Sequence, residues 1–153
     1  GSGTSSFFSS TDNTFFITGV QLEVGQNPTE FEHEPFERTL AKARRYFQRH
    51  DNANSAYRWF GAGYITSTTS GWFGVVLDPI MRVTPSLTTT DATKFLVDVY
   101  TGGKATSALS LNFSSNKLAR ISPTTSGVTA GDPAFLASNG DSELRALYFD
   151  SEL

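Results

Sequence analysis

The alternation of apolar and polar residues that recurs after residue 55 constrains this chain more than any other feature. Two runs show it most clearly, KFLVDVYT at 94–101 and SALSLNFSS at 107–115. Successive side chains of a strand point to opposite faces, so alternation at period two predicts strands with one buried side. The residues predicted to point inward are Phe95, Val97, Val99, Leu109, Leu111 and Phe113.

Turn-forming residues separate this part of the chain into short segments, which is typical of an antiparallel β protein. The sequence predicts strands over 57–66, 71–80, 81–90, 94–101, 107–115, 117–124, 135–140 and 142–153, with a loop over 125–134. The 13 Phe, 5 Tyr and 2 Trp, together with many Thr residues, favour pleated surfaces. We therefore expect an all-β fold, an antiparallel β-sandwich or jelly-roll-like head.

The residues before position 51 do not show the pattern of the β-sandwich that follows them. Residues 1–13 indicate an extended or flexible lead-in, and TFFITGVQLEV at 14–24 predicts a strand. FERTLAKARRYFQR at 36–49 is rich in helix formers and predicts a short helix. The expected organisation is an extended N-terminal segment with a strand over 1–35, a helix or neck over 36–50, and the sandwich over 51–153.

The predicted helix carries apolar residues at heptad spacing. Phe36, Leu40, Ala43, Phe47 and His50 follow one another by four, three, four and three residues. One interpretation is a helix packed against a face of the sandwich. The sequence alone favours it, because two heptads are fewer than the three or four that indicate a coiled coil. The other is a seam at a threefold axis, and it makes Phe36, Leu40, Ala43 and Phe47 the candidate trimer interface.

Charge and composition exclude several classes of protein. A formal net charge of −3 and a pI of about 5.3 argue against a general nucleic-acid-binding surface. The absence of Cys excludes disulfides and Cys-based zinc sites, and no apolar run reaches the length of a membrane span. His33 stands between two glutamates, but neighbouring positions do not converge on one side of an extended chain, so we expect no metal and no cofactor.

Five blocks of the sequence resemble one protein family. They are ITGVQLEVG at 17–25, TEFE at 29–32, ARRYFQR at 43–49, PIMRVTPSLT at 79–88 and YFDSEL at 148–153. Together they are similar to a signature of phage tail fibre and virion fibre proteins, in which the first block ends a carbohydrate-binding-module-like jelly roll. Ala43 stands where the family usually has Cys, and only the last strand of that jelly roll is present here. The resemblance implies a homotrimeric distal domain at the tip of a virion tail fibre.

The same resemblance implies a host cell-surface glycan or an outer-membrane receptor as the partner. The candidate ligand-binding residues are Tyr57, Arg58, Trp59, Trp72 and Asp78, where aromatic rings stand beside groups that hydrogen-bond hydroxyls. The competing interpretation, which we favour because aromatic residues are usually buried, is that these rings fill the core or the subunit interface. Polar loops between the strands are a second candidate surface.

Enzymatic motifs are absent from the sequence. It contains no G-x-S-x-G, P-loop or H-E-x-x-H pattern. Asp78, Asp91 and Asp98 offer carboxylate pairs for a polysaccharide depolymerase, although a chain with 15 acidic residues contains such pairs by chance. We expect a non-enzymatic receptor-binding tip, with a purely structural trimerisation or capping module as the alternative.

Overall fold

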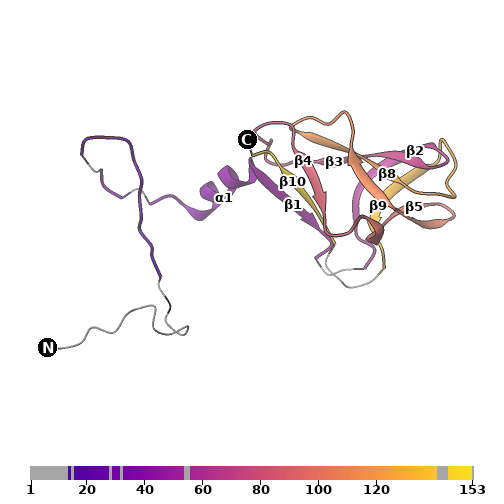
Figure 1. Cartoon of the computed structure of the whole chain (residues 1–153), viewed down its shortest axis with the longest axis horizontal. Coiled ribbons are helices and arrows are strands. Elements are labelled where there is room, and N and C mark those ends of the chain that lie inside the picture. Colours follow the sequence, from indigo (N-terminus) through magenta and orange to yellow (C-terminus); the bar gives the residue numbers. More distant parts are fainter. Residues whose placement is uncertain are drawn as a thin grey trace. The chain divides into compact units, whose positions relative to one another are not determined.

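The computed structural model describes residues 14, 16–27, 29–31, 33–53, 56–140 and 145–152. The chain divides into two units, Gly1–Pro35 and Phe36–Leu153. The prediction for residues 1–13 lies outside the described residues. The second unit is mostly β, with one short helix among its described residues, which confirms the predicted all-β class (Figure 1).

The described residues of the first unit do not form the strand predicted over 14–24. They form neither helix nor strand, and a bend at 25–27 lies between Glu23 and Thr29, whose side chains meet. The Thr29 hydroxyl donates to Glu23 Oε2 over 2.6 Å, and the Gln21 amide donates to the same oxygen over 3.0 Å. The alternation at 14–24 finds no partner strand among the described residues, and a strand without a partner has no ladder to stabilise it.

The predicted helix is shorter than expected. Helix α1 covers Phe36–Arg44, and strand β1 begins at Phe47 and runs to Asp51. The prediction of a helix to residue 49 is therefore wrong, and Phe47 and His50 do not share a helical seam with Phe36. No residue of α1 is buried, so the interpretation that this helix packs against the sandwich is wrong as well.

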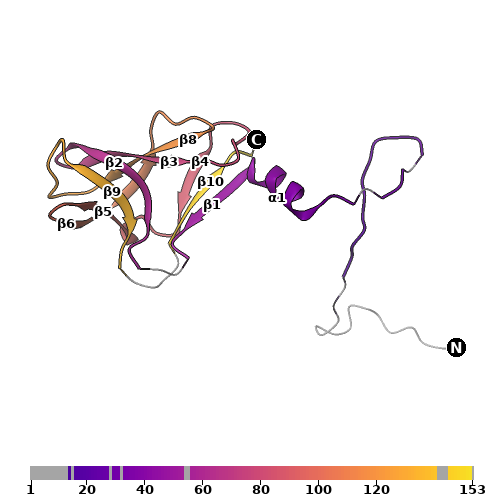
Figure 2. The same ribbon diagram turned by 180° about the vertical axis from the view of Figure 1, so that it is seen from behind.

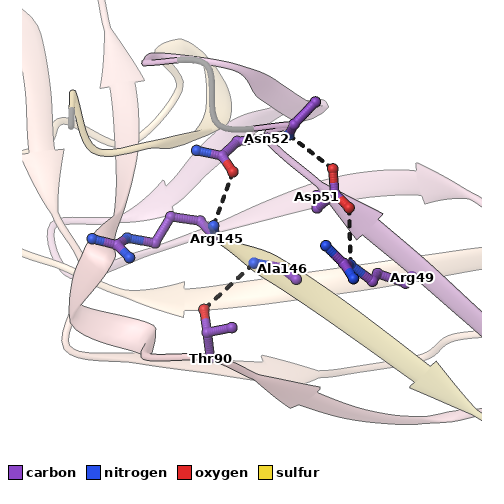
Figure 3. A network of polar contacts seen from close by, with 7 residues as sticks. Arg49, Asp51, Asn52, Thr90, Arg145 and Ala146 are labelled. Atoms are coloured by element: carbon purple, nitrogen blue, oxygen red, sulfur yellow. Dashed lines mark hydrogen bonds and ion pairs between the residues drawn. The ribbon is translucent and has the colours of Figure 1, made fainter. Parts of the chain in front are cut away.

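The smaller of two sheets has three strands in the order β1-β10-β4. Strand β10, Ala146–Asp150, lies antiparallel to β1 on one side and to β4, Ser86–Thr89, on the other. A polar network joins the ends of these strands (Figure 3). The backbone N–H of Arg145 donates to Asn52 Oδ1 over 2.9 Å, and Arg49 Nε pairs with Asp51 Oδ2 at 2.9 Å.

The larger sheet has seven strands in the order β6-β5-β9-β2-β3-β8-β7, and every pairing is antiparallel. Its strands are β2 Trp59–Ser67, β3 Ser70–Val76, β5 Phe95–Val99, β6 Gly102–Ala105, β7 Ala108–Leu111, β8 Leu118–Thr124 and β9 Pro133–Ser138. A 3-10 turn, η2 at Ala92–Lys94, precedes β5. Both views show the two sheets facing each other like the layers of a sandwich (Figures 1 and 2).

The core lies between these sheets. Leu147 and Phe149 of β10 belong to one apolar cluster with Phe73, Phe95 and Leu136 of the larger sheet, and all five are fully buried. The predicted inward positions of β5 are confirmed, because Phe95, Val97 and Val99 are buried, and Leu109 and Leu111 pack against the cluster from the edge.

The predicted inward position of Phe113 is wrong. Strand β7 ends at Leu111, and Phe113 has a φ of 52° and is 84% exposed. Alternation cannot continue through a residue in left-handed backbone, because the chain turns there. The hairpin of 57–66 with 71–80 is confirmed by β2 and β3, although β3 ends at Val76 and the predicted strand 81–90 shortens to β4.

Candidate functional site

The outer face of the seven-stranded sheet carries the candidate site, and Trp59 is its main residue. The Trp59 indole stacks on the Phe135 ring from the neighbouring strand, with ring centroids 4.2 Å apart and planes 9° from parallel. The indole Nε1–H donates to Asp98 Oδ2 over 3.3 Å. Trp59 is nevertheless 57% exposed and Phe135 36% exposed. Two rings held in a fixed orientation therefore face solvent.

The sheet register explains why these residues meet. Asp98 of β5 lies opposite Phe135 of β9, and Phe135 lies opposite Ala62 of β2. The pairing of β2 with β9 shifts between Trp59 and Gly61, so the alternation of β2 is interrupted beside the indole. Bulges of this kind re-aim a side chain without breaking the sheet.

A shallow groove runs beside the stacked rings. Its volume is about 290 Å³, and it is lined by Trp59, Asp98, Val99, Tyr100, Pro133 and Phe135. Tyr100 is 99% exposed at the β5–β6 turn. The lining combines flat apolar surfaces with one carboxylate, and Asp98 Oδ1 has no hydrogen-bond partner among the described residues. Such a groove suits a ligand with an apolar face and hydroxyl groups.

A second aromatic group lies on the same sheet. Arg120 of β8 lies between two rings, with its guanidinium carbon 4.1 Å from the Trp72 centroid and 4.4 Å from the Phe113 centroid. Arg120 Nε donates to the Asn112 carbonyl over 2.8 Å. The Tyr64 ring meets Trp72 edge to face with centroids 5.8 Å apart. Cation–π contacts hold Arg120 against this face of the sheet.

The predicted ligand-binding residues separate into different places. Arg58 directly precedes β2, Trp59 begins that strand, and both residues line one pocket. Trp72 belongs to the second aromatic group. Tyr57 precedes β2 with a φ of 57°, and its ring lies over Gly140, where an added Cβ atom would clash with the ring.

Asp78 lies apart from these rings in the loop after β3. Its backbone N–H donates to Gln48 Oε1 over 3.2 Å, which ties it to β1. The interpretation that the aromatic rings fill the core is correct for Phe73 and partly correct for Phe60, which packs on the core. The other three rings, Tyr57, Trp59 and Tyr64, are exposed.

The sequence alone does not assign a binding role to the two groove residues that contact Trp59. It places Phe135 in a strand without a site role and offers Asp98 only as one of several scattered carboxylates. Both follow from the register of β5, β9 and β2, which brings positions 98, 135 and 62 into one row. The alternation of each strand was readable, but nothing local indicates which strands are neighbours.

The predicted interface residues are exposed in the protomer. Phe36 is 74% exposed, Leu40 37% and Phe47 46%, and Ala43 is exposed too. Phe47 stacks on Tyr148 of β10 with centroids 6.0 Å apart, instead of continuing α1. Three of the four candidates thus lie on the helix and one lies on the adjoining strand.

No protein-family model, curated protein or solved structure matches the chain. The likeness to tail fibre proteins therefore rests on the sequence blocks alone. Within the described ranges, no helix has the length and apolar content needed to cross a bilayer. The described part of the chain also brings no three His, Cys, Asp or Glu residues together in a way that could hold a metal ion.

Proposed function

We propose that the chain is the distal part of a phage tail fibre or similar virion fibre, which acts as a homotrimer and binds a host-surface glycan without cleaving it. The observation that carries the proposal is the Trp59–Phe135 stack beside Asp98 on an open groove. The resemblance of residues 17–25, 29–32 and 43–49 to fibre proteins supplies the biological setting.

The chemistry of the groove suits a sugar ring. The C–H groups on one face of a pyranose carry slight positive charge, and the face of an indole carries negative charge, so the two surfaces attract. Asp98 Oδ1 accepts hydroxyl hydrogen bonds at the edge of that contact. Because Asp98 Oδ2 and Phe135 hold the indole, little conformational freedom is lost when a ligand binds.

The homotrimer is part of the same proposal. A shallow, open groove gives a weak site, and three weak sites on one particle bind a repetitive glycan far more tightly than one site does. The apolar residues that α1 leaves exposed, Phe36 and Leu40, supply a surface for association.

These exposed helical residues also favour the alternative function. A chain that only trimerises or caps a fibre needs the surface of α1 and no glycan site, and the Trp59 groove would then be an ordinary exposed patch. The two functions differ in whether the isolated protein binds host polysaccharide in a Trp59-dependent manner.

A pair of substitutions tests the proposal. Trp59→Ala removes the stacking surface, while Tyr64→Ala removes another exposed ring of the same strand that does not line the groove. We expect Trp59→Ala to weaken binding to immobilised host-surface polysaccharide by about tenfold or more per site, as truncation of an aromatic anchor does. Tyr64→Ala should bind like the unmodified chain.

The measurement is surface binding of the purified chain to polysaccharides extracted from candidate bacterial hosts, with circular dichroism of each variant as the check on folding. Equal loss of binding in both variants would indicate non-specific adhesion of aromatic surface. A folded, oligomeric chain that binds none of the polysaccharides would favour the structural module, and release of oligosaccharides would show a depolymerase.

A further inference from the structure

A polar pocket adjoins the aromatic groove, and Trp59 lines both. The pocket has a volume of about 320 Å³ and is lined by Arg44, Arg49, His50, Asp51, Arg58, Trp59 and Phe60. These residues come from the end of α1, from β1 and from the start of β2. The pocket therefore opens where the edge strand of the small sheet passes the start of β2.

The charge of this pocket is unbalanced. Three arginines are among its lining residues, and Asp51 is the acidic residue among them. Asp51 already has partners, because its Oδ2 pairs with Arg49 Nε at 2.9 Å and its Oδ1 accepts from the Ala53 N–H over 2.8 Å (Figure 3). Within the described part of the chain, Arg44 and Arg58 make no ion pair. Two cations of the pocket thus have no counter-charge among the residues that the structure describes.

The pKa of His50 reflects the same excess of positive charge. Burial lowers the pKa of His50 below its ordinary value of 6.5, and the nearby charges of Arg44 and Arg58 lower it further, while Asp51 raises it. The ring also faces Gln48 Oε1 at 3.4 Å and meets Phe149 edge to face. A neutral imidazole at this position gains a proton most readily when an anion enters the pocket.

We propose that this pocket binds an oxyanion, a phosphate or carboxylate group, carried by the sugar that stacks on Trp59. The inference rests on the proposed function, because it names the chemical class of glycan for the same site. The ligand is an acidic or phosphorylated sugar whose ring contacts the indole and whose anionic group lies between Arg44 and Arg58.

Arginine suits this role better than lysine would. Its planar guanidinium presents paired N–H groups that match two oxygens of a phosphate or carboxylate, and it stays charged at all relevant pH values. Asp51 orients Arg49 through the network of Figure 3, so one of the three cations is positioned before the ligand arrives. Trp59 lines both cavities, so we place the sugar ring against the indole and its anionic group in the pocket.

Isothermal titration with four probes separates the contributions of ring and charge. The probes are glucose, glucose 6-phosphate, glucuronic acid and inorganic phosphate, in a phosphate-free buffer of low ionic strength that limits screening. We expect both charged sugars to bind at least about tenfold more tightly than glucose, as hydrogen bonds to charged groups allow. The comparison of the two charged sugars distinguishes a phosphate source from a carboxylate source.

Matched substitutions locate the charge effect. Arg58→Gln and Arg44→Gln each remove one unpaired cation from the pocket, whereas Arg82→Gln makes the same change outside it, where Arg82 faces Tyr46 at 5.8 Å. We expect the first two to lose most of the preference for charged sugars and to keep the affinity for glucose. Loss of the preference in Arg82→Gln as well would show a general field effect and overturn the inference.

The outcomes for the inference and for the proposed function differ. If charged and uncharged sugars bind with equal affinity and both depend on Trp59, the proposal of an anion-binding pocket is wrong, while the glycan-binding function is supported. Arg58-dependent binding of inorganic phosphate without binding of any sugar would support the pocket and contradict the glycan function. No binding of any probe would overturn both.

The pH dependence gives an independent measurement. An anion in the pocket raises the pKa of His50, so by linkage the affinity for glucuronic acid should rise as the pH falls from about 7.5 to about 5.5. His50→Gln should remove this rise, since it removes the imidazole that takes up the proton. The same rise in His50→Gln would show that another group is responsible.

Discussion

At the scale of single residues, two glycines of the neighbouring strands β2 and β3 differ in the space around them. A Cβ atom at Gly63 of β2 would clash with the carbonyl oxygen of Trp72 on the neighbouring strand. A Cβ atom at Gly74 of β3 would meet only Leu118 Cδ1, at an ordinary distance of 3.4 Å. The first glycine permits a close approach of two backbones, while the second leaves space above the sheet.

This difference predicts opposite effects of the same substitution. Gly63→Ala should lower the free energy of unfolding by about 1–3 kcal/mol, because the backbone must move to accept the methyl group. Gly74→Ala should change it by less than about 1 kcal/mol or raise it slightly, since Ala loses less backbone entropy than Gly on folding. Urea unfolding followed by far-UV circular dichroism measures both. Equal stability of the two variants would contradict the close approach.

At the scale of elements, β1 depends on one buried side chain. Gln48 is 3% exposed, and its amide donates to the Arg44 carbonyl over 3.1 Å and to the Pro79 carbonyl over 2.6 Å. Its Oε1 accepts the Asp78 N–H over 3.2 Å. Gln48 therefore joins the end of α1, the strand β1 and the loop after β3.

Gln48→Met tests this connection. Methionine has a similar length but makes none of the three hydrogen bonds, so buried backbone groups lose their partner. We expect the free energy of unfolding to fall by about 2–4 kcal/mol, from the desolvation of these groups. Gln26→Met, an exposed position in the first unit, is the control and should unfold at the same urea concentration as the unmodified chain. A stable Gln48→Met chain would show that water replaces the amide.

The sequence predicts a strand correctly where apolar and polar residues alternate within that strand. It fails where the secondary structure depends on pairing with a strand that is distant in the sequence. The buried side of β5 and the extent of β8 follow from alternation and from turn residues. Residues 45–49 favour a helix by composition, yet Phe47 pairs with Asp150 and Arg49 with Tyr148. The energy of that pairing comes from residues about a hundred positions away, and local propensity does not contain it.

The candidate site shows the same limit. Trp59 and Arg58 were predictable because aromatic and hydrogen-bonding residues adjoin in the sequence. The pocket with Arg44 and the stack on Phe135 depend on which strand lies next to β2, and local alternation does not give that order.

At the scale of the whole molecule, α1 is the element that the protomer leaves without support. A helix of nine residues is marginal alone in water, and no residue of α1 is buried in the protomer. Phe36 and Leu40 lie one turn apart and are 74% and 37% exposed. If three copies associate through this helix, the copies cover the apolar side of α1, and this burial explains why so short a helix is stable.

Light scattering coupled to size exclusion tests the association. We expect a particle of about three times the 16.6 kDa of the chain at micromolar concentration. Phe36→Ser with Leu40→Ser should reduce the mass to that of a single chain and leave the β spectrum intact, because neither residue belongs to the apolar core cluster or to the hydrophobic residues that pack on it. Val76→Ser with Leu118→Ser is the control, since this exposed apolar pair faces solvent across β3 and β8. If the variant with both helix substitutions is still a trimer, the interface lies on another surface. If the unmodified chain has the mass of a single chain, the homotrimer is contradicted, together with the avidity that depends on it.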